Sequence, residues 1–135
     1  MFMYGTAMKN RIKAGLMDAD DVAIIGVLHG AASKWALKAG HPQADPTQQH
    51  WMDKIFALKK AGVNIQLEIC GVNMMGNHWT KADLYSYDEF GNPDPAAPGR
   101  IYVNQGAIGR VTDLQQRKFV YYNFWIKGVT QTVFF

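Results

Sequence analysis

The chain has 135 residues, about the length of one domain, so we expect a single domain spanning residues 1–135. Hydrophobic residues make up 48% of the chain and charged residues 19%, which excludes an intrinsically disordered protein. The formal net charge of +3 is spread along the sequence with no basic run longer than Lys59-Lys60. This pattern argues against a nucleic-acid or acidic-membrane partner.

The cysteine content and the hydropathy limit the cellular setting. Cys70 is the single cysteine, so the fold contains no internal disulfide. No apolar stretch approaches the ~20 residues that a membrane span needs, and the N-terminus does not have the pattern of a signal peptide. We therefore expect a cytoplasmic location, and leave open export by a signal removed upstream.

The first third of the chain predicts a helix, a strand and a second, short helix. Apolar side chains recur every four residues at Met8, Ile12 and Leu16, which is typical of an amphipathic helix, and the acidic cluster at 18–21 should end it. Residues 22–28 form a short apolar run rich in β-branched residues, as in a strand covered on both faces. Residues 31–39 should form a short helix that Gly40 closes.

The middle of the chain predicts another helix and a half-polar strand. Asp45 should cap the helix and Pro46 should open it, and Gly62 should close it. The face that packs on the sheet carries Trp51, Ile55 and Leu58. Residues 63–69 alternate apolar and polar side chains, which predicts a strand near a sheet edge or a subunit contact.

The last part of the chain continues the alternation of strands and helices. Thr80 and Asp83 resemble a capping box, and residues 87–99 should form a surface loop. We then expect a strand at 101–103, a helix at 107–117 and a last strand at 119–124. The inward residues of that helix should be Ile108, Val111 and Leu114. This order predicts an α/β fold, a three-layer α/β/α open sheet with mostly parallel strands.

The C-terminal segment is more apolar than one strand would need to be. Its aromatic residues are Phe119, Tyr121, Tyr122, Phe124, Trp125, Phe134 and Phe135. Residues 125–135 have no clear partner in the predicted sheet. We therefore expect this tail to form a subunit interface in a homo-oligomer.

Two residues that could carry chemistry follow predicted strands. His29 directly follows the strand at 22–28, and Cys70 follows the strand at 63–69. Reacting groups in open parallel sheets gather outside the carboxyl ends of the strands. A thiol at a helix N-terminus, near an imidazolium, forms the reactive thiolate and can hold a persulfide. The competing interpretations are a buried, inert cysteine and a histidine that only makes hydrogen bonds at a turn.

Other candidate motifs are less specific. Met74, Met75 and His78 could bind copper, or with Cys70 zinc, but the chain has no Cys-x-x-Cys pair. Asp18, Asp20 and Asp21 are typical of solvated acidic residues in a connection. Gly106 and Gly109 do not complete a dinucleotide or phosphate-loop fingerprint. We therefore assign no metal ligands and expect no cofactor.

Three segments together resemble the DsrE/DsrF-like family, including its YchN-type members. The segments are VAIIGVLHGAASKWAL, KKAGVNIQLEICGVNMMG and IYVNQGAIGRVTDLQQRKFVYY. The resemblance implies a flavodoxin-like fold, assembly into trimers or hexamers, and a sulfur-relay role in which the matching cysteine, Cys70, holds a persulfide. The family's first strand has no counterpart before the first helix of this sequence, and the loop from Asp88 to Pro98 is longer than the family pattern.

The sequence thus supports two hypotheses. In the first, the protein is a sulfur carrier or sulfurtransferase-like protein with Cys70 and His29 as its catalytic residues and a donor or acceptor protein as its partner. In the second, it is a non-enzymatic oligomeric module that binds a metal, a small ligand or a partner protein. Whether the protein is an enzyme stays open.

Overall fold

A computed structural model describes residues 1–45, 49–97, 99–119, 121–126 and 129–134, and it describes side chains for these residues except 49, 50 and 121–134. The helices are α1 (Phe2–Lys13), α2 (Gln49–Lys60), α3 (Gly71–Gly76) and α4 (Ala107–Gln116), with 3₁₀ turns η1 (Ala19–Asp21), η2 (Gly30–Ala36) and η3 (Lys81–Asp83). The strands are β1 (Ile24–Leu28), β2 (Ile65–Cys70), β3 (Ile101–Asn104), β4 (Tyr121–Ile126) and β5 (Val129–Phe134).

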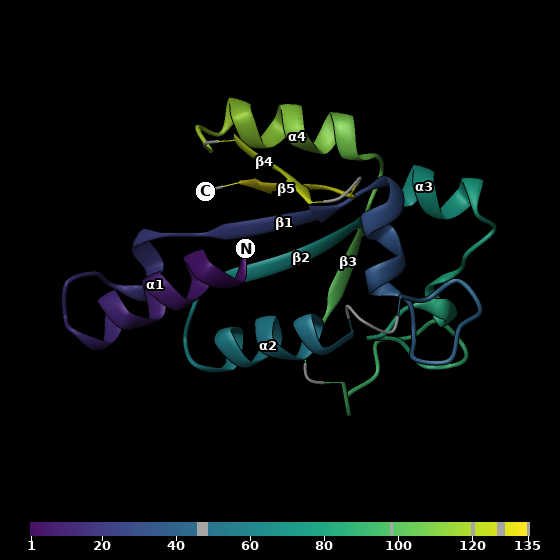
Figure 1. The fold of residues 1–135 in the computed structure, drawn as a ribbon, viewed down its shortest axis with the longest axis horizontal. Helices are drawn as coiled ribbons and strands as arrows, with labels where there is room; N and C mark the ends of the chain where they lie inside the picture. Colours follow the sequence, from purple (N-terminus) through teal and green to yellow (C-terminus); the bar gives the residue numbers. More distant parts are fainter. Residues whose placement is uncertain (46–48, 98, 120, 127–128, 135) are drawn as a thin grey trace.

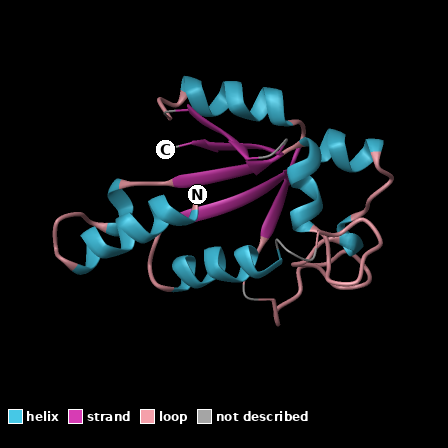
Figure 2. Ribbon diagram, in the orientation of Figure 1, coloured by secondary structure: helices cyan, strands magenta, loops and turns pink. Residues whose placement is uncertain are grey.

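The strands form one sheet in the order β3-β2-β1-β5-β4. β1, β2 and β3 pair in parallel, whereas β5 is antiparallel to both β1 and β4. Figure 1 shows α1 and α2 on one face of this sheet and α4 on the other, and Figure 2 shows the same layers by type of structure. The chain therefore has the predicted three-layer α/β architecture, of the small flavodoxin-like kind.

The larger part of the core lies between the sheet and the α1/α2 layer. Alternate residues of the strands, such as Ile24, Leu67 and Ile101, are almost completely buried there against α2 residues such as Met52 and Phe56. Each such Ile or Leu side chain contributes about 1.5–3 kcal/mol by leaving water. A smaller cluster on the opposite face packs against α4. The continuous apolar run of β1 is buried on both faces, as the sequence predicts.

β2 lies next to the edge strand β3, near one edge of the sheet as predicted, but it is an interior strand and not the edge itself. Its neighbours are β1 on one side and β3 on the other. The polar residues of its alternating pattern face α4, and Glu68 among them is only 2% exposed. The alternation therefore marks a buried polar contact between the sheet and α4, described below.

The C-terminal tail has a partner in the sheet, contrary to the prediction from sequence. β5 pairs with β1 from Ile25↔Phe134 to Leu28↔Gln131, and it also pairs with β4. It thus separates β1 from β4 and runs opposite to the other strands. The side chains of residues 121–134, and residue 135, lie outside the described part, so the role of the aromatic tail in a subunit interface stays a prediction.

Several helix boundaries and faces differ from the predictions. α1 ends at Lys13, and Leu16 beyond it is 67% exposed. The short helix before Gly40 is the 3₁₀ turn η2, which ends at Ala36. In α4, Leu114 is buried as predicted, but Ile108 is 82% exposed because the helix packs on the sheet through Ala107 and Leu114, and Ile108 lies off that face. The predicted cap of α2 at Pro46 lies outside the described residues.

The free edge of β3 is covered by a loop. The backbone N–H of Ile101 donates to Ser86 Oγ at 2.9 Å, and the buried Tyr87 hydroxyl donates to the Ile101 carbonyl at 2.9 Å. These side chains supply the hydrogen bonds that a further strand would otherwise make. The loop therefore protects the edge strand from pairing with another chain.

Tyr87→Phe should lower the free energy of unfolding by about 1–2 kcal/mol, because it leaves the Ile101 carbonyl without its partner. Urea denaturation of both proteins measures the difference. The matched control is Tyr102→Phe, since Tyr102 is partly exposed and its hydroxyl makes no hydrogen bond within the described part of the chain. Equal effects of the two substitutions would contradict this interpretation.

Candidate functional site

Cys70 lies at the carboxyl end of β2, as the topology predicts. It is the last residue of the strand and the N-cap of α3, and it is 2% exposed. Its Sγ accepts a hydrogen bond from the backbone N–H of Ala107, at 3.3 Å. Ala107 is the first residue of α4, so the sulfur lies at the positive end of that helix. The thiol therefore combines burial with a backbone donor suited to a negative sulfur.

His29 lies on the same rim of the sheet but makes no recorded polar contact with Cys70. β1 and β2 align Leu28 with Ile69, so His29, directly after β1, and Cys70, the last residue of β2, lie at equivalent positions. His29 is exposed, and its side chain makes no hydrogen bond or ion pair within the described ranges. α3 contacts the neighbouring residue, since Asn73 donates to the Gly30 carbonyl at 3.3 Å. The topology thus brings the pair to one edge without joining their side chains.

The side chain of Glu68 is the main polar feature beside Cys70, and the sequence did not single it out. Its carboxylate accepts from Arg110 Nε at 3.0 and 2.9 Å and from Arg110 Nη2 at 2.7 Å. It also accepts from Gln66 Nε2 at 2.8 Å and from Asn104 Nδ2 at 3.2 Å. Two features of the sequence could have indicated this contact. They are the alternating polar residues of β2 and the presence of Arg110 on α4, a helix with an apolar face.

Arg110 also contacts an ion pair on the surface of α4. Its Nη1 donates to Asp113 at 2.6 Å, and Arg117 donates to the same carboxylate at 3.1 Å. The hydrogen bonds that Arg110 donates to Glu68 raise the pKa of Arg110 above its usual value. The hydrogen bond from Arg117 lowers the pKa of Asp113, and Arg110 acts in the same direction. Both shifts favour the charged forms of Arg110 and Asp113 at neutral pH.

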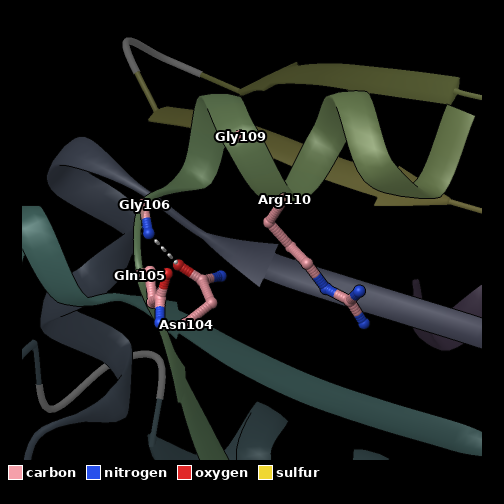
Figure 3. Close-up of a pocket in the computed structure, with 5 residues that line it drawn as sticks. All are labelled: Asn104, Gln105, Gly106, Gly109 and Arg110. Atoms are coloured by element: carbon pink, nitrogen blue, oxygen red, sulfur yellow. Dashed lines mark hydrogen bonds between the residues drawn. The ribbon is translucent and has the colours of Figure 1, made fainter. Parts of the chain in front are cut away.

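An open hollow of about 570 Å³ lies at the carboxyl end of β3, next to the start of α4. It is lined by Asn104, Gln105, Gly106, Gly109 and Arg110, and Figure 3 shows the Arg110 side chain extending from α4 away from Asn104 and Gln105. The Asn104 side chain accepts a hydrogen bond from the Gly106 N–H at 3.1 Å, which caps the turn into α4. The hollow thus adjoins the helix end that contacts Cys70.

The residues suggested as metal ligands are not gathered around Cys70. Met74 is buried in the core cluster on the α1/α2 face, whereas Cys70 belongs to the cluster on the α4 face. Met75 is 69% exposed, and His78 is also exposed. Within the described residues, no three His, Cys, Asp or Glu side chains come close enough to bind one ion. Asp18, Asp20 and Asp21 are solvated, as their sequence pattern predicts.

Acid should weaken the fold through Asp83 and Asp113. A hydrogen bond from the Thr80 N–H, at 2.7 Å, lowers the pKa of Asp83, and the Arg117 hydrogen bond lowers that of Asp113, both below the ordinary 3.8. The unfolded chain therefore binds protons at higher pH than the folded chain. Stability from these groups is complete well above 3.8 and decreases as pH falls through that value towards the folded pKa.

Denaturation at a series of pH values tests this dependence. The parent protein should lose stability steadily below about pH 4. The double variant Asp83→Asn/Asp113→Asn, whose amides do not titrate, should show a smaller loss over the same interval. An identical pH dependence in the two proteins would contradict the assignment of these carboxylates.

Two further findings concern membrane-spanning helices and similarity to known proteins. Within the part of the chain that the structure describes, no helix combines the length and apolar character needed to cross a membrane. Comparison with known proteins found no match to a family model, to a curated protein or to a solved structure.

Proposed function

We propose that this protein is a sulfur carrier of the DsrE/DsrF-like kind, in which Cys70 holds sulfane sulfur as a persulfide. The Cys70 thiolate attacks the outer sulfur of a donor persulfide, the donor's S–S bond breaks, and the donor's inner sulfur leaves as a thiolate. Cys70 then carries the S–SH group. A thiolate on an acceptor protein attacks its outer sulfur in turn, and Cys70 leaves as the thiolate.

The observation that carries this proposal is the hydrogen bond from the Ala107 N–H to Cys70 Sγ. A backbone donor at a helix N-terminus stabilises a sulfur anion more than a neutral thiol. A cysteine that served only as a small apolar side chain would not need such a donor. The position of Cys70 at the carboxyl edge of a parallel sheet, where such folds place reacting groups, supports the same function.

The burial of Cys70 sets a condition on this function. Its side chain is 2% exposed and packs with Leu114 and Val27 in the cluster beneath α4. A donor or acceptor thiolate must approach the outer sulfur directly, so transfer requires a displacement of α3 or of the first turn of α4. The hollow beside Gly106 adjoins that turn, so we propose that a partner's thiolate approaches from this side.

The test is the intact mass of the native protein after incubation with a low-molecular-weight persulfide donor, with and without reductant. The expected result is a gain of one sulfur that reductant removes and that Cys70→Ser does not show. His29→Ala should slow the gain, because the proposal places His29 beside Cys70 at the same edge of the sheet. An unchanged mass, or equal gain in Cys70→Ser, would contradict the proposal.

The burial of Cys70 favours a second candidate, a non-enzymatic oligomeric module that binds a small ligand, a metal or a partner protein. In that case Cys70 is a structural residue of the α4 cluster and the hollow is the binding site. Metal analysis and light scattering of the purified protein separate the candidates. A stoichiometric metal, or an oligomer without sulfur loading, supports the module, whereas trimers or hexamers that load sulfur support the carrier.

A further inference from the structure

We propose that the Glu68–Arg110 ion pair is a positioning device that holds the first turn of α4, and with it the Ala107 N–H, against the sulfur of Cys70. The role depends on the proposed function only in that Cys70 is the reacting group. Among the described hydrogen bonds, none joins Glu68 or Arg110 to Sγ, so they are positioning residues and not catalytic ones.

The spacing of the contacts carries the inference. Glu68 and Cys70 are two residues apart, so both face α4 from the same strand. Arg110 and Ala107 are three residues apart, so both face β2 from the same side of α4. The Glu68–Arg110 bonds and the Cys70–Ala107 bond thus run side by side between one strand and one helix.

Glu68 reaches the start of α4 by a second route. Asn104 donates its amide N–H to Glu68 at 3.2 Å and accepts the Gly106 N–H with its amide oxygen at 3.1 Å. Gly106 is the N-cap of α4 and directly precedes Ala107. The Glu68 carboxylate is therefore linked to α4 at two points, directly at Arg110 and through Asn104 at Gly106. Ala107, the donor to Cys70, lies between these two points in the sequence.

The cost of burying Glu68 supports a specific role for the pair. The Glu68 carboxylate lies in an interior strand with its side chain 3% exposed, so it loses its hydration. Only well-placed hydrogen-bond donors compensate for that loss. An apolar pair of similar volume would hold α4 on the sheet equally well. What an apolar pair would not supply is directional bonding, which determines the rotation and height of the first helical turn.

The test is the titration of Cys70, followed by the ultraviolet absorbance of the thiolate against pH, with Cys70→Ser subtracted. Among the described residues, the ionisable side chains on the elements next to Cys70 are Glu68 of β2, Tyr102 of β3, Arg110 and Asp113 of α4, and His29 directly after β1. The variant Glu68→Gln/Arg110→Met removes the pair without changing the net charge. Its thiolate should form at a pH about one unit higher, a tenfold smaller population at a given pH.

Two comparisons separate positioning from general effects. The control Asp113→Asn/Arg117→Gln removes an ion pair from the same helix, also without changing net charge, and should leave the titration in place because Glu68 still binds Arg110. Arg110→Lys keeps the positive charge but loses the forked geometry. It should shift the titration upward by a smaller amount, whereas an effect of charge alone predicts no shift.

The outcomes distinguish this inference from the proposed function. A folded double variant, or a folded Arg110→Lys variant, that titrates like the parent overturns the positioning role, whether or not the parent protein loads sulfur. An upward shift in a parent that cannot be loaded with sulfur supports the positioning role and contradicts the sulfur carrier. Circular dichroism at the titration pH confirms that each variant is folded.

Discussion

Arg110→Met is expected to lower the free energy of unfolding by about 2–4 kcal/mol, within the range for breaking a largely buried ion pair. The substitution removes every bond from Arg110 to the Glu68 carboxylate, whose remaining donors among the described residues are Gln66 and Asn104. Arg110 is partly exposed, so water replaces some of the lost interaction. The remaining cost is that of a buried charge without a counter-charge. Urea denaturation at neutral pH measures it.

Substitutions of Glu68, the partner of Arg110, and of Arg117 on the surface provide the controls for this prediction. Glu68→Gln in the Arg110→Met background should recover most of the lost stability, since no buried charge then remains. Arg117→Gln should change stability by less than about 0.5 kcal/mol, because exposed pairs contribute little. A double variant less stable than Arg110→Met alone would show that the cost comes from lost packing and not from the uncompensated charge.

Gly71→Ala should cost about 1–3 kcal/mol through overpacking, and it should also impair sulfur loading. A Cβ on Gly71 would lie 2.4 Å from the backbone oxygen of Asn104, at the end of β3. A backbone oxygen cannot move aside as a side chain can, so the end of β3 has to shift away from β2. That end leads directly into the turn that places Ala107 on Cys70.

The matched control for this substitution lies in the same short helix. A Cβ on Gly76, the last residue of α3, would meet no atom within 4 Å among those described, so Gly76→Ala should leave stability unchanged or raise it slightly. Thermal unfolding and the mass-based loading assay are measured on both variants. Equal behaviour of the two variants would mean that the close approach of Gly71 to β3 has no energetic consequence.

The order of strands and helices could be read from the sequence, because each element repeats a local pattern. The apolar run of β1 and the periodic face of α4 depend on neighbours within one strand or one turn. The placement of His29 and Cys70 at one edge followed from topology, since parallel strands bring their carboxyl ends together. The Thr80 and Asp83 capping box was also recognisable, and it forms as predicted.

Two features of the fold could not be read in this way. β5 pairs with β1, which lies about a hundred residues earlier, and no periodicity specifies such a distant partner. The polar alternation of β2 fits both a solvated edge and a buried polar contact. The choice depends on whether a residue from another element, here Arg110, supplies the charge.

The sequence by itself determined the α/β class, the single cysteine at a strand end and the residues able to form each element, because these follow from composition and local periodicity. Only the tertiary structure decided that Cys70 is buried, that Ala107 donates to its sulfur and that Glu68 binds Arg110. These contacts join residues 37 and 42 positions apart. They exist because the chain must satisfy buried polar groups with whatever donors the packing of α4 on the sheet brings within reach.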